Sequence, residues 1–588
     1  MSDVRSIRSR EVSILWGKKI PLRDGVHLHA TVYLPRDKEA AAPCIATLTP
    51  YVSDTYHDFG MHFARESFPF VVVDVRGRGN SEGQFRPLIQ EADDVHDCIE
   101  WLAKQPYCDG QVALWGGSYA GYVQWAAIEG RSSHLRTIVP AASPYPGLDF
   151  PMRSNIFYPL LIRWLTYTSG RTSQARLVAD DSFWSSLYRE WFESGDAFCD
   201  IDNRLGSSFP IFQEWLSHPE PDDYWDAYSP SVAQYANFSL PILTITGSYD
   251  DDQLGALEHY RRHVGPDEAR ASNHYLIIGP WDHEGTRAPK SSVGGVDIGP
   301  AGLLDLSGLH VEWYRWVMEG APKPSFLRKR VAYYVMGADE WRYADSLAAV
   351  TSGTDCLFLD SEGTANHITG WGILTSTPGD GLPDSYRYDP REIHGPEIEA
   401  EARRSPCSLI DQATMVALDG RLLTYDSAVL EDSLEISGFF KLTAWISIDC
   451  PDTDVYFAIY EVFPDGRVIR LSTAAMRARY RQGLKTPKLI TTVEPLPYDV
   501  DSFTFISRRI QKGHRLRLVI APIGPLMEGN FIQKNYNGGG AVAEEIQGEA
   551  KPVTVILFHD IQHPSTLRVP RGEQMQLPST PVVTSSKQ

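Results

Sequence analysis

Cysteine is scarce in this sequence. Seven cysteines are spread over 588 residues, and no two of them form a Cys-x-x-Cys pair. A scattered set of odd number argues against a disulfide framework and against a zinc ribbon. We therefore expect reduced, partly buried thiols in a cytoplasmic protein, and we expect no metal site.

Long apolar runs and an excess of basic residues are also absent. No apolar stretch approaches the eighteen or so residues that a membrane-spanning helix needs, and the segment MSDVRSIRSREVSILWGKK has no apolar core of a secretory signal. Acidic residues outnumber basic ones by 75 to 55, which gives a net charge of −20. This charge disfavours nucleic acid and anionic membranes as partners. A small-molecule substrate is the expected partner, while a monomer, a homodimer and a higher homo-oligomer all remain open.

The first part of the chain alternates between two kinds of pattern. Short apolar runs at 44–49, 70–75 and 112–118 are typical of buried parallel strands. Helical spacing follows at 94–105 and 121–130. Strands that alternate with helices indicate a parallel α/β sheet.

Three changes of pattern divide the rest of the chain. Residues 1–145 and 238–345 have the α/β pattern, and residues 146–237 between them are rich in aromatic, helix-like segments, including 157–167. We expect these residues to form a helical cap inserted into one α/β domain. Residues 346–588 contain strand patterns and almost no helical ones, which predicts a C-terminal β-sandwich or jelly roll.

The strongest chemical signal is the segment VALWGGSYAG at 112–121. An apolar strand ends in glycines, reaches Ser118 and continues into a helix, which is the context of a nucleophile elbow. The serine of such an elbow lies on a sharp turn, so the residues two before and two after it must be small. Gly116 and Ala120 meet this demand. A glycine-rich turn with an inactive serine is the alternative interpretation.

A serine nucleophile needs a base and an acid that orients the base. In this architecture the chain order is serine, acid, histidine. Asp250 follows the strand pattern 241–247, and His283 follows the strand pattern 274–280. Each residue taken alone is as well explained by a surface turn or loop, but the correct order at three strand ends favours a triad.

An acyl-transfer site also needs hydrogen-bond donors for the oxyanion. The backbone N–H of Tyr119, directly after the nucleophile, is one candidate. The second donor usually comes from the loop after an earlier strand, where Tyr51 follows the run 44–49. We therefore expect the Tyr51 phenol to be the second donor, with a surface-packed tyrosine as the alternative.

With these motifs in place, the sequence resembles the family of cocaine esterase, α-amino acid ester hydrolases and X-prolyl dipeptidyl peptidases. The similar segments extend over nearly the whole chain: DGVHLHATVYLPRD (24–37), TPY (49–51), VVVDVRGRGNSEGQF (71–85), GGSYAG (116–121), GSYD (247–250), GPWDH (279–283), EVFPDGR (461–467), RIQKGHRLRLVIA (509–521) and KNYNGGG (534–540). This family places its elbow glycine one position later than the usual pattern, which accounts for Ala120 followed by Gly121.

The resemblance implies an α/β-hydrolase core with a helical cap, followed by a jelly-roll domain, and no cofactor. It implies that Ser118 is the nucleophile, that His283 is the general base and then acid, and that Asp250 orients the histidine. Tyr51 and the Tyr119 amide would hold the oxyanion. The function implied is hydrolysis of a carboxylic ester or amide through an acyl-enzyme.

The substrate pocket is less well defined by the motifs. Trp164 lies near the cap position that lines the acyl pocket in cocaine esterase, and Trp281 of GPWDH is a further candidate. Family members that act on α-amino acyl groups carry extra carboxylates after the catalytic aspartate, where Asp251 and Asp252 stand here. The residues that follow depart from that pattern, so a solvated acidic turn or helix N-cap competes with amine binding.

Three functions therefore remain in comparison. The leading one is an esterase or amidase for a neutral acyl group. An α-amino acid ester hydrolase or X-prolyl dipeptidyl peptidase that recognises a free α-amine is the second. A binding protein whose jelly roll holds carbohydrate is a distant third. We also expect the jelly roll to pack on the hydrolase core and to help wall the pocket.

Overall fold

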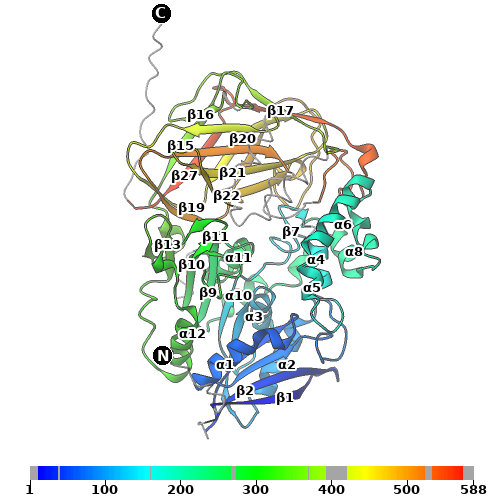
Figure 1. Ribbon diagram of the computed structural model, residues 1–588, viewed down its shortest axis with the longest axis vertical. Helices are drawn as coiled ribbons and strands as arrows, with labels where there is room; N and C mark the ends of the chain where they lie inside the picture. Colours follow the sequence, from blue (N-terminus) through cyan, green and yellow to red (C-terminus); the bar gives the residue numbers. More distant parts are fainter. Residues whose placement is uncertain are drawn as a thin grey trace, which may run out of the picture.

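A computed structural model describes residues 11–36, 40–158, 160–266, 273–367, 370–392, 409, 420–523 and 533–573. Figure 1 shows two large β-sheets at opposite ends of the long axis, with a group of helices beside them. The predicted architecture is confirmed: an α/β core is interrupted by a helical cap and followed by an all-β domain.

The core is one ten-stranded sheet in the order β1-β2-β4-β3-β5-β6-β9-β10-β13-β14. From β4 to β13 all neighbouring strands are parallel, whereas β1, β2 and β14 pair antiparallel at the two edges. The strands are β1 (Val12–Pro21), β2 (His27–Pro35), β3 (Ala42–Thr49), β4 (Phe70–Asp74), β5 (Cys108–Gly117), β6 (Leu135–Ala141), β9 (Ile242–Tyr249), β10 (His274–Asp282), β13 (Val331–Val335) and β14 (Glu340–Ala344).

Helices cover both faces of this sheet, which explains why its strands are apolar on both sides. In β4, Val71 and Val73 pack in one buried cluster, and Phe70 and Val72 pack in another. Because side chains alternate along a strand, this run of apolar residues serves both faces at once. The helices and 3-10 turns of the core are η1 (Ser53–Tyr56), α1 (His57–Arg65), α2 (Glu91–Leu102), α3 (Tyr119–Gly130), α11 (Gln253–Val264), η3 (Pro300–Gly302), α12 (Leu306–Glu319) and η4 (Ala348–Val350).

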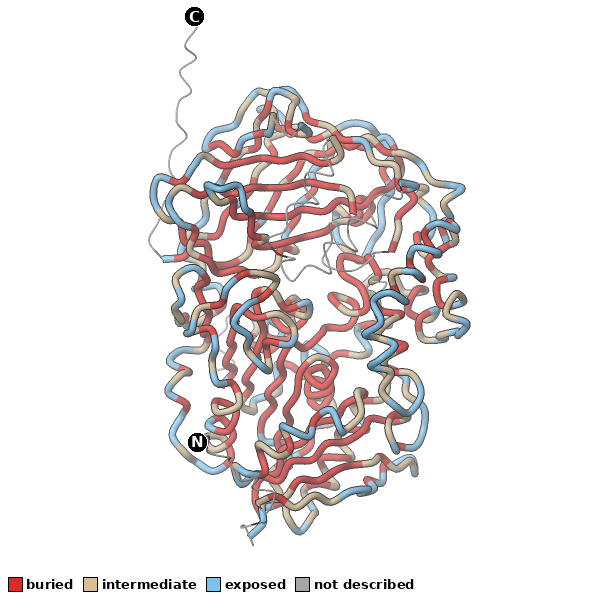
Figure 2. Tube along the Cα trace, in the orientation of Figure 1, coloured by how far each residue is buried: buried red, intermediate tan, exposed pale blue. Residues whose placement is uncertain are grey.

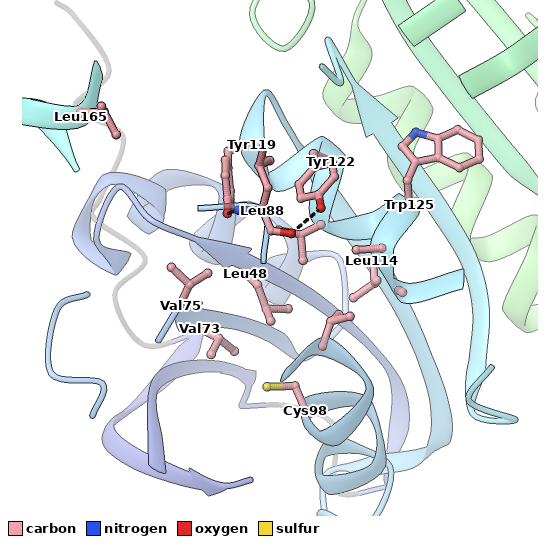
Figure 3. Close-up of a cluster of buried hydrophobic side chains, with 14 of the residues drawn as sticks. Leu48, Val73, Val75, Leu88, Cys98, Leu114, Tyr119, Tyr122, Trp125 and Leu165 are labelled. Carbon is pink, nitrogen blue, oxygen red and sulfur yellow. Dashed lines mark hydrogen bonds between the residues drawn. The ribbon is translucent and has the colours of Figure 1, made fainter. Parts of the chain in front are cut away.

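Helix α3 is held firmly behind the predicted nucleophile. Figure 3 shows Tyr119, Tyr122 and Trp125 of this helix beside apolar side chains of neighbouring strands. Tyr122 donates a hydrogen bond to the backbone oxygen of Leu88 at 2.9 Å, drawn there as a dashed line. Nearly every residue of α3 is buried, so the helix and the turn before it have little freedom to move.

The cap lies between β6 and β9, and its core is built from tryptophans. Trp184, Trp191, Trp215 and Trp225 are all fully buried. The predicted helix 157–167 begins only at Leu160, because the residues before it form a small hairpin. The cap contains β7 (Met152–Arg153), β8 (Ile156–Phe157), α4 (Leu160–Tyr167), α5 (Ala175–Val178), α6 (Asp181–Ser194), η2 (Phe198–Asp200), α7 (Ile201–Arg204), α8 (Pro210–Leu216), α9 (Asp223–Asp226) and α10 (Val232–Asn237). A second small hairpin in the core consists of β11 (Ser292–Val293) and β12 (Val296–Asp297).

The C-terminal domain is a thirteen-stranded sheet folded around its own apolar core. Figure 2 shows its strands buried along most of their length, with exposure concentrated in the connections. Its strands are β15 (Gly353–Asp360), β16 (Gly372–Thr375), β17 (Asp384–Tyr388), β18 (Leu423–Ser427), β19 (Leu434–Gly438), β20 (Lys441–Ile448), β21 (Asp454–Val462), β22 (Val468–Arg477), β23 (Leu496–Val500), β24 (Ile506–Ile510), β25 (Arg515–Pro522), β26 (Val553–Phe558) and β27 (Thr566–Arg571), with the turns η5 (Ala478–Tyr480) and η6 (Gln547–Glu549).

Specific hydrogen bonds join this domain to the core and to the cap. The Gln253 side chain donates to the Phe505 backbone oxygen at 3.1 Å and accepts from the Phe505 N–H at 2.6 Å. Arg477 donates to the backbone oxygen of Asn155 in the cap hairpin at 2.9 Å. No helix in the described part of the chain combines the length and apolar character needed to cross a bilayer.

Candidate active site

Ser118 lies at the junction of β5 and α3 in a strained conformation. Its φ and ψ are 60° and −131°, a region that residues other than glycine rarely adopt. A Cβ on Gly116 would lie 2.7 Å from the Cβ of Ala120 and 3.0 Å from Thr47 Oγ1. The turn therefore has room for small residues only at these two positions, as the elbow interpretation requires.

The serine opens into a cavity of about 630 Å³ between the core and the cap. Aromatic side chains form much of its wall, namely Tyr51, Tyr56, Phe59, Tyr119, Phe150, Tyr158, Trp164 and Tyr167. Its ionisable side chains are Asp149, Arg153, Asp251, Asp252, His283, Glu284 and Arg287. A largely apolar cavity with a few convergent polar groups is typical of a small-molecule site.

His283 and Asp250 meet at this cavity from the ends of β10 and β9. His283 Nδ1 lies 2.9 Å from Asp250 Oδ1, and the Asp250 side chain is fully buried. Asp250 also accepts hydrogen bonds from Thr246 Oγ1 at 2.8 Å and from the Asp252 N–H at 3.1 Å. These bonds fix the carboxylate, and a proton on Nδ1 leaves Nε2 available as a base.

Ser118 and His283 line the same cavity, although no hydrogen bond joins them within the described residues. Such contacts are often long without substrate and tighten when substrate binds.

Tyr51 lies with its hydroxyl beside the Ser118 side chain. Its hydroxyl lies 3.3 Å from Ser118 Oγ and accepts a hydrogen bond from Trp164 Nε1 at 3.3 Å. Its ring stacks on Tyr167 with 5.3 Å between centroids. Burial raises the pKa of Tyr51 above its ordinary value, so the phenol keeps its proton and remains a donor.

Tyr119 follows the nucleophile, and its side chain anchors the start of α3. The Tyr119 hydroxyl donates to the Glu91 carboxyl group and accepts from the Leu88 N–H at 2.7 Å. Burial raises the pKa of Glu91 to about 7. These contacts hold the residue whose backbone N–H would face an oxyanion formed at Ser118.

Two carboxylates that approach the cavity lie in an unfavourable environment for negative charge. Asp149 is buried and accepts hydrogen bonds from the backbone N–H groups of Tyr145, at 2.8 Å, and of Gly255. Burial raises the pKa of Asp149 to about 7. Burial and the neighbouring Asp149 and Asp250 also raise the pKa of Asp252, whose side chain is 15% exposed. A bound cation would relieve this accumulation of negative charge.

The predicted substrate-binding residues differ in whether they line the cavity. Trp164, Asp251 and Asp252 all line the cavity. Trp281 does not, so its prediction as a substrate-binding residue is wrong: it is fully buried and donates to the Gly302 backbone oxygen at 2.9 Å. The side chain points into the core because it belongs to the buried part of β10.

The described residues of the C-terminal domain support the cavity from behind. Among the residues that the structure describes, those lining the cavity lie between Tyr51 and Arg287, so the expectation that this domain helps to wall the pocket needs correction for that part of the chain. Its contribution is support, because Arg153 lines the cavity and donates to the Thr473 backbone oxygen at 2.8 Å.

Asp149 and Arg287 are among the cavity residues that the sequence did not single out. Asp149 lies in the loop after β6 and Arg287 in the loop after β10, and neither belongs to a sequence motif that predicts a place at the cavity. Arg287 follows His283 closely in the chain, which is the only signal that could have drawn attention to it.

Comparisons with known proteins identify relatives of this chain. The sequence profile of the X-Pro dipeptidyl-peptidase (S15) family matches residues 24–285, and the profile of the X-Pro dipeptidyl-peptidase C-terminal non-catalytic domain matches residues 327–522. A cocaine esterase from Rhodococcus sp. is 26% identical over 577 residues, which cover 94% of this chain and 97% of the esterase.

Solved structures show the same fold at lower identity. An α-amino acid ester hydrolase superposes with a TM-score of 0.80 at 20% identity, covering 97% of this chain and all of that chain (100%). An aminopeptidase from a Thaumarchaeota archaeon has a TM-score of 0.80 at 20% identity, covering 95% of this chain and 96% of that one.

Proposed function

Because the chain belongs to the X-Pro dipeptidyl-peptidase (S15) family, which includes cocaine esterase, and is therefore a serine hydrolase, we propose that Ser118, His283 and Asp250 form its catalytic triad. The reaction proposed is hydrolysis of a carboxylic ester or amide through an acyl-enzyme.

Each step of this reaction has a residue in place. Ser118 Oγ attacks the carbonyl carbon while His283 Nε2 takes its proton, and Asp250 stabilises the resulting imidazolium. The Tyr51 hydroxyl and the Tyr119 N–H hold the negative oxygen of the tetrahedral intermediate. His283 then protonates the leaving group, and a water molecule activated by the same histidine releases the acid and regenerates Ser118.

The observation that carries this proposal is the position of Tyr51. A protonated phenol lies 3.3 Å from a serine in the elbow conformation, in the cavity that also contains the His283–Asp250 pair. A serine in an inactive turn has no need of a hydrogen-bond donor held beside its hydroxyl.

Covalent labelling tests the assignment of the nucleophile. A fluorophosphonate should modify the protein once, and peptide mapping should locate the adduct on Ser118. Ser118→Ala should abolish labelling and hydrolysis of a 4-nitrophenyl ester, whereas Ser143→Ala, a buried serine nearby, should still be labelled. Hydrolysis that survives in Ser118→Ala at the wild-type rate would refute the proposal.

A second candidate function, hydrolysis of α-amino acyl substrates, is favoured by Asp149 and Asp252. Both line the cavity of Ser118, and burial, together with neighbouring carboxylates, raises the pKa of each. A substrate ammonium group would supply the missing positive charge. The neutral acyl group remains the leading substrate class, because the wall around Trp164 is largely aromatic.

Matched esters separate the two classes. The kcat/KM values for an alanine 4-nitrophenyl ester and for the corresponding propionate should be compared, with an X-Pro 4-nitroanilide added to examine peptidase activity. A preference for the amine that disappears in Asp252→Asn, but not in the exposed-site control Asp223→Asn, favours aminoacyl substrates. Equal rates for both esters favour a neutral acyl group.

The state of the cysteines bears on the cellular location. We place the protein in the cytoplasm because Cys44, Cys98, Cys108, Cys199, Cys356 and Cys450 are all free thiols. Fractionation of the source cells, with activity measured in each fraction, tests this location.

A further inference from the structure

Arg287 places a positive charge directly beside the nucleophile. It lines the cavity, and its side chain lies over Gly117, the residue before Ser118. A Cβ on Gly117 would fall 2.2 Å from Arg287 Nη1 and 2.8 Å from Arg287 Cδ. The guanidinium group therefore occupies the space that a side chain at position 117 would need.

This guanidinium group has no partner among the described residues. Arg287 makes a backbone hydrogen bond to Glu284 at 3.0 Å, but within that part of the chain its side chain makes neither a hydrogen bond nor an ion pair. Arg287 is partly exposed, whereas two buried arginines have carboxylate partners: Arg477 lies 2.8 Å from Asp454, and Arg517 lies 2.7 Å from Asp426. A guanidinium group is always charged and carries a planar fork of N–H donors, so these donors remain available to a ligand.

The alternative role for Arg287 is to balance the acidic wall of the cavity. Its charge does reach that wall: burial and nearby carboxylates raise the pKa of Asp252, and Arg287 opposes this rise. An arginine that served only as a counter-charge would be expected to form an ion pair with one of these carboxylates. Within the described residues no atom pair of Arg287 and a carboxylate comes within the 4.0 Å of an ion pair, although Asp251, Asp252 and Glu284 line the same cavity.

We propose that Arg287 is a specificity-determining residue that binds a carboxylate group of the substrate close to the scissile bond. This inference rests on the proposed function, because it assigns a substrate class to the Ser118 site. The planar guanidinium group matches a carboxylate through two parallel hydrogen bonds. The acidic side chains nearby would repel that carboxylate elsewhere in the cavity, so Arg287 would also fix its position.

A carboxylate on the leaving group is compatible with the neutral acyl group favoured above, whereas a carboxylate on the acyl group would replace that assignment. Two ester pairs distinguish these halves of the substrate. For the leaving group, 4-acetoxybenzoate is compared with its methyl ester. For the acyl group, the monophenyl ester of glutarate is compared with its methyl ester. In each pair the scissile bond is the same and only the remote charge differs.

The variants Arg287→Gln and Arg287→Lys are measured against Arg176→Gln. Arg176 is an exposed cap residue, so its substitution changes the net charge equally without touching the cavity. The wild type should favour the carboxylate member of one pair by about 10- to 100-fold in kcat/KM, the range of one charge-assisted contact. Arg287→Gln should abolish this preference, Arg287→Lys should retain part of it, and Arg176→Gln should leave it unchanged.

The pair that shows the preference identifies which half of the substrate carries the carboxylate. The proposal is overturned if the wild type favours neither carboxylate ester, or if Arg287→Gln slows both members of a pair by the same factor. Competitive inhibition of the wild type by 4-hydroxybenzoate, compared with its methyl ester, gives a second measurement that does not depend on a variant folding.

Failure of this proposal is distinguishable from failure of the proposed function. If Ser118 is labelled and neutral esters are hydrolysed, but no carboxylate preference exists, only the role of Arg287 is refuted. If hydrolysis survives in Ser118→Ala, the proposed function itself fails.

Discussion

Tyr51→Phe isolates the contribution of one hydroxyl group to the stabilisation of the transition state. The change keeps the ring and its stacking on Tyr167, but it removes the donor that lies 3.3 Å from Ser118 Oγ. Loss of one oxyanion donor typically costs about 2.7–4 kcal/mol, so kcat should fall by about 10²- to 10³-fold. KM should change little, because the hydrogen bond strengthens only as negative charge develops.

The stability of this variant and its pH dependence follow from the same contacts. Trp164 Nε1 loses its acceptor on Tyr51, which should lower the free energy of unfolding by roughly 1–2 kcal/mol. Burial raises the pKa of Tyr51, so the phenol is protonated at both pH 7 and pH 9, and the loss in kcat should be equal at the two values.

Steady-state kinetics with a 4-nitrophenyl ester, combined with thermal unfolding, make the measurement. Tyr167→Phe is the matched control, since it removes another hydroxyl from the same cavity wall and should have a far smaller effect on kcat. A fall in kcat of less than about fivefold, or a loss confined to KM, would refute the role given to Tyr51.

Further predictions concern groups behind the site. Arg78 is buried, and it donates to the Pro50 backbone oxygen at 2.7 Å and to carbonyl groups of the cap. Arg78→Met should therefore lower the free energy of unfolding in urea by about 3–6 kcal/mol. Unchanged stability would contradict this prediction. Burial raises the pKa of Glu91 from 4.5 to about 7. The free energy of unfolding therefore falls as the pH rises from 4.5 to 7, and the total loss above pH 7 is about 3 kcal/mol. Glu91→Gln should therefore gain stability relative to the wild type between pH 4.5 and pH 8, and a difference that stays constant with pH would rule out this explanation. A Cβ on Gly255 would lie 2.4 Å from the Tyr145 backbone nitrogen and 2.5 Å from Asp149 Oδ1. Gly255→Ala should therefore displace both residues and lower the stability in thermal unfolding by about 1–3 kcal/mol, and wild-type stability would show that the site relaxes freely.

Local patterns were sufficient for the parts of the protein that depend on local rules. The strand–turn–helix around Ser118 was predictable because the steric demand of the elbow involves neighbouring residues, as the close approach of Gly116 and Ala120 shows. The strands that lead to Asp250 and His283 were predictable because both faces of a parallel sheet are buried, which leaves an apolar run in the sequence.

Sequence patterns gave wrong predictions where two different local structures can have the same residue composition. The predicted helix at 157–167 starts at Leu160, because the apolar residues before it pair in a hairpin that packs against the C-terminal domain. Trp281 belongs to the same motif as His283, yet it is fully buried, because it still lies within β10 whereas His283 follows the end of that strand.

The sequence by itself determined the class of fold, the nucleophile turn and the order of the three residues proposed as a triad. Only the tertiary structure decided that Tyr51 reaches Ser118, that Asp149 joins Asp252 at the cavity, and that Arg287 lies over Gly117 without a partner in the described chain. The reason is that a turn or a strand is set by neighbours in the chain. By contrast, the charge that a cavity presents depends on which distant side chains meet there and on how far burial removes them from water.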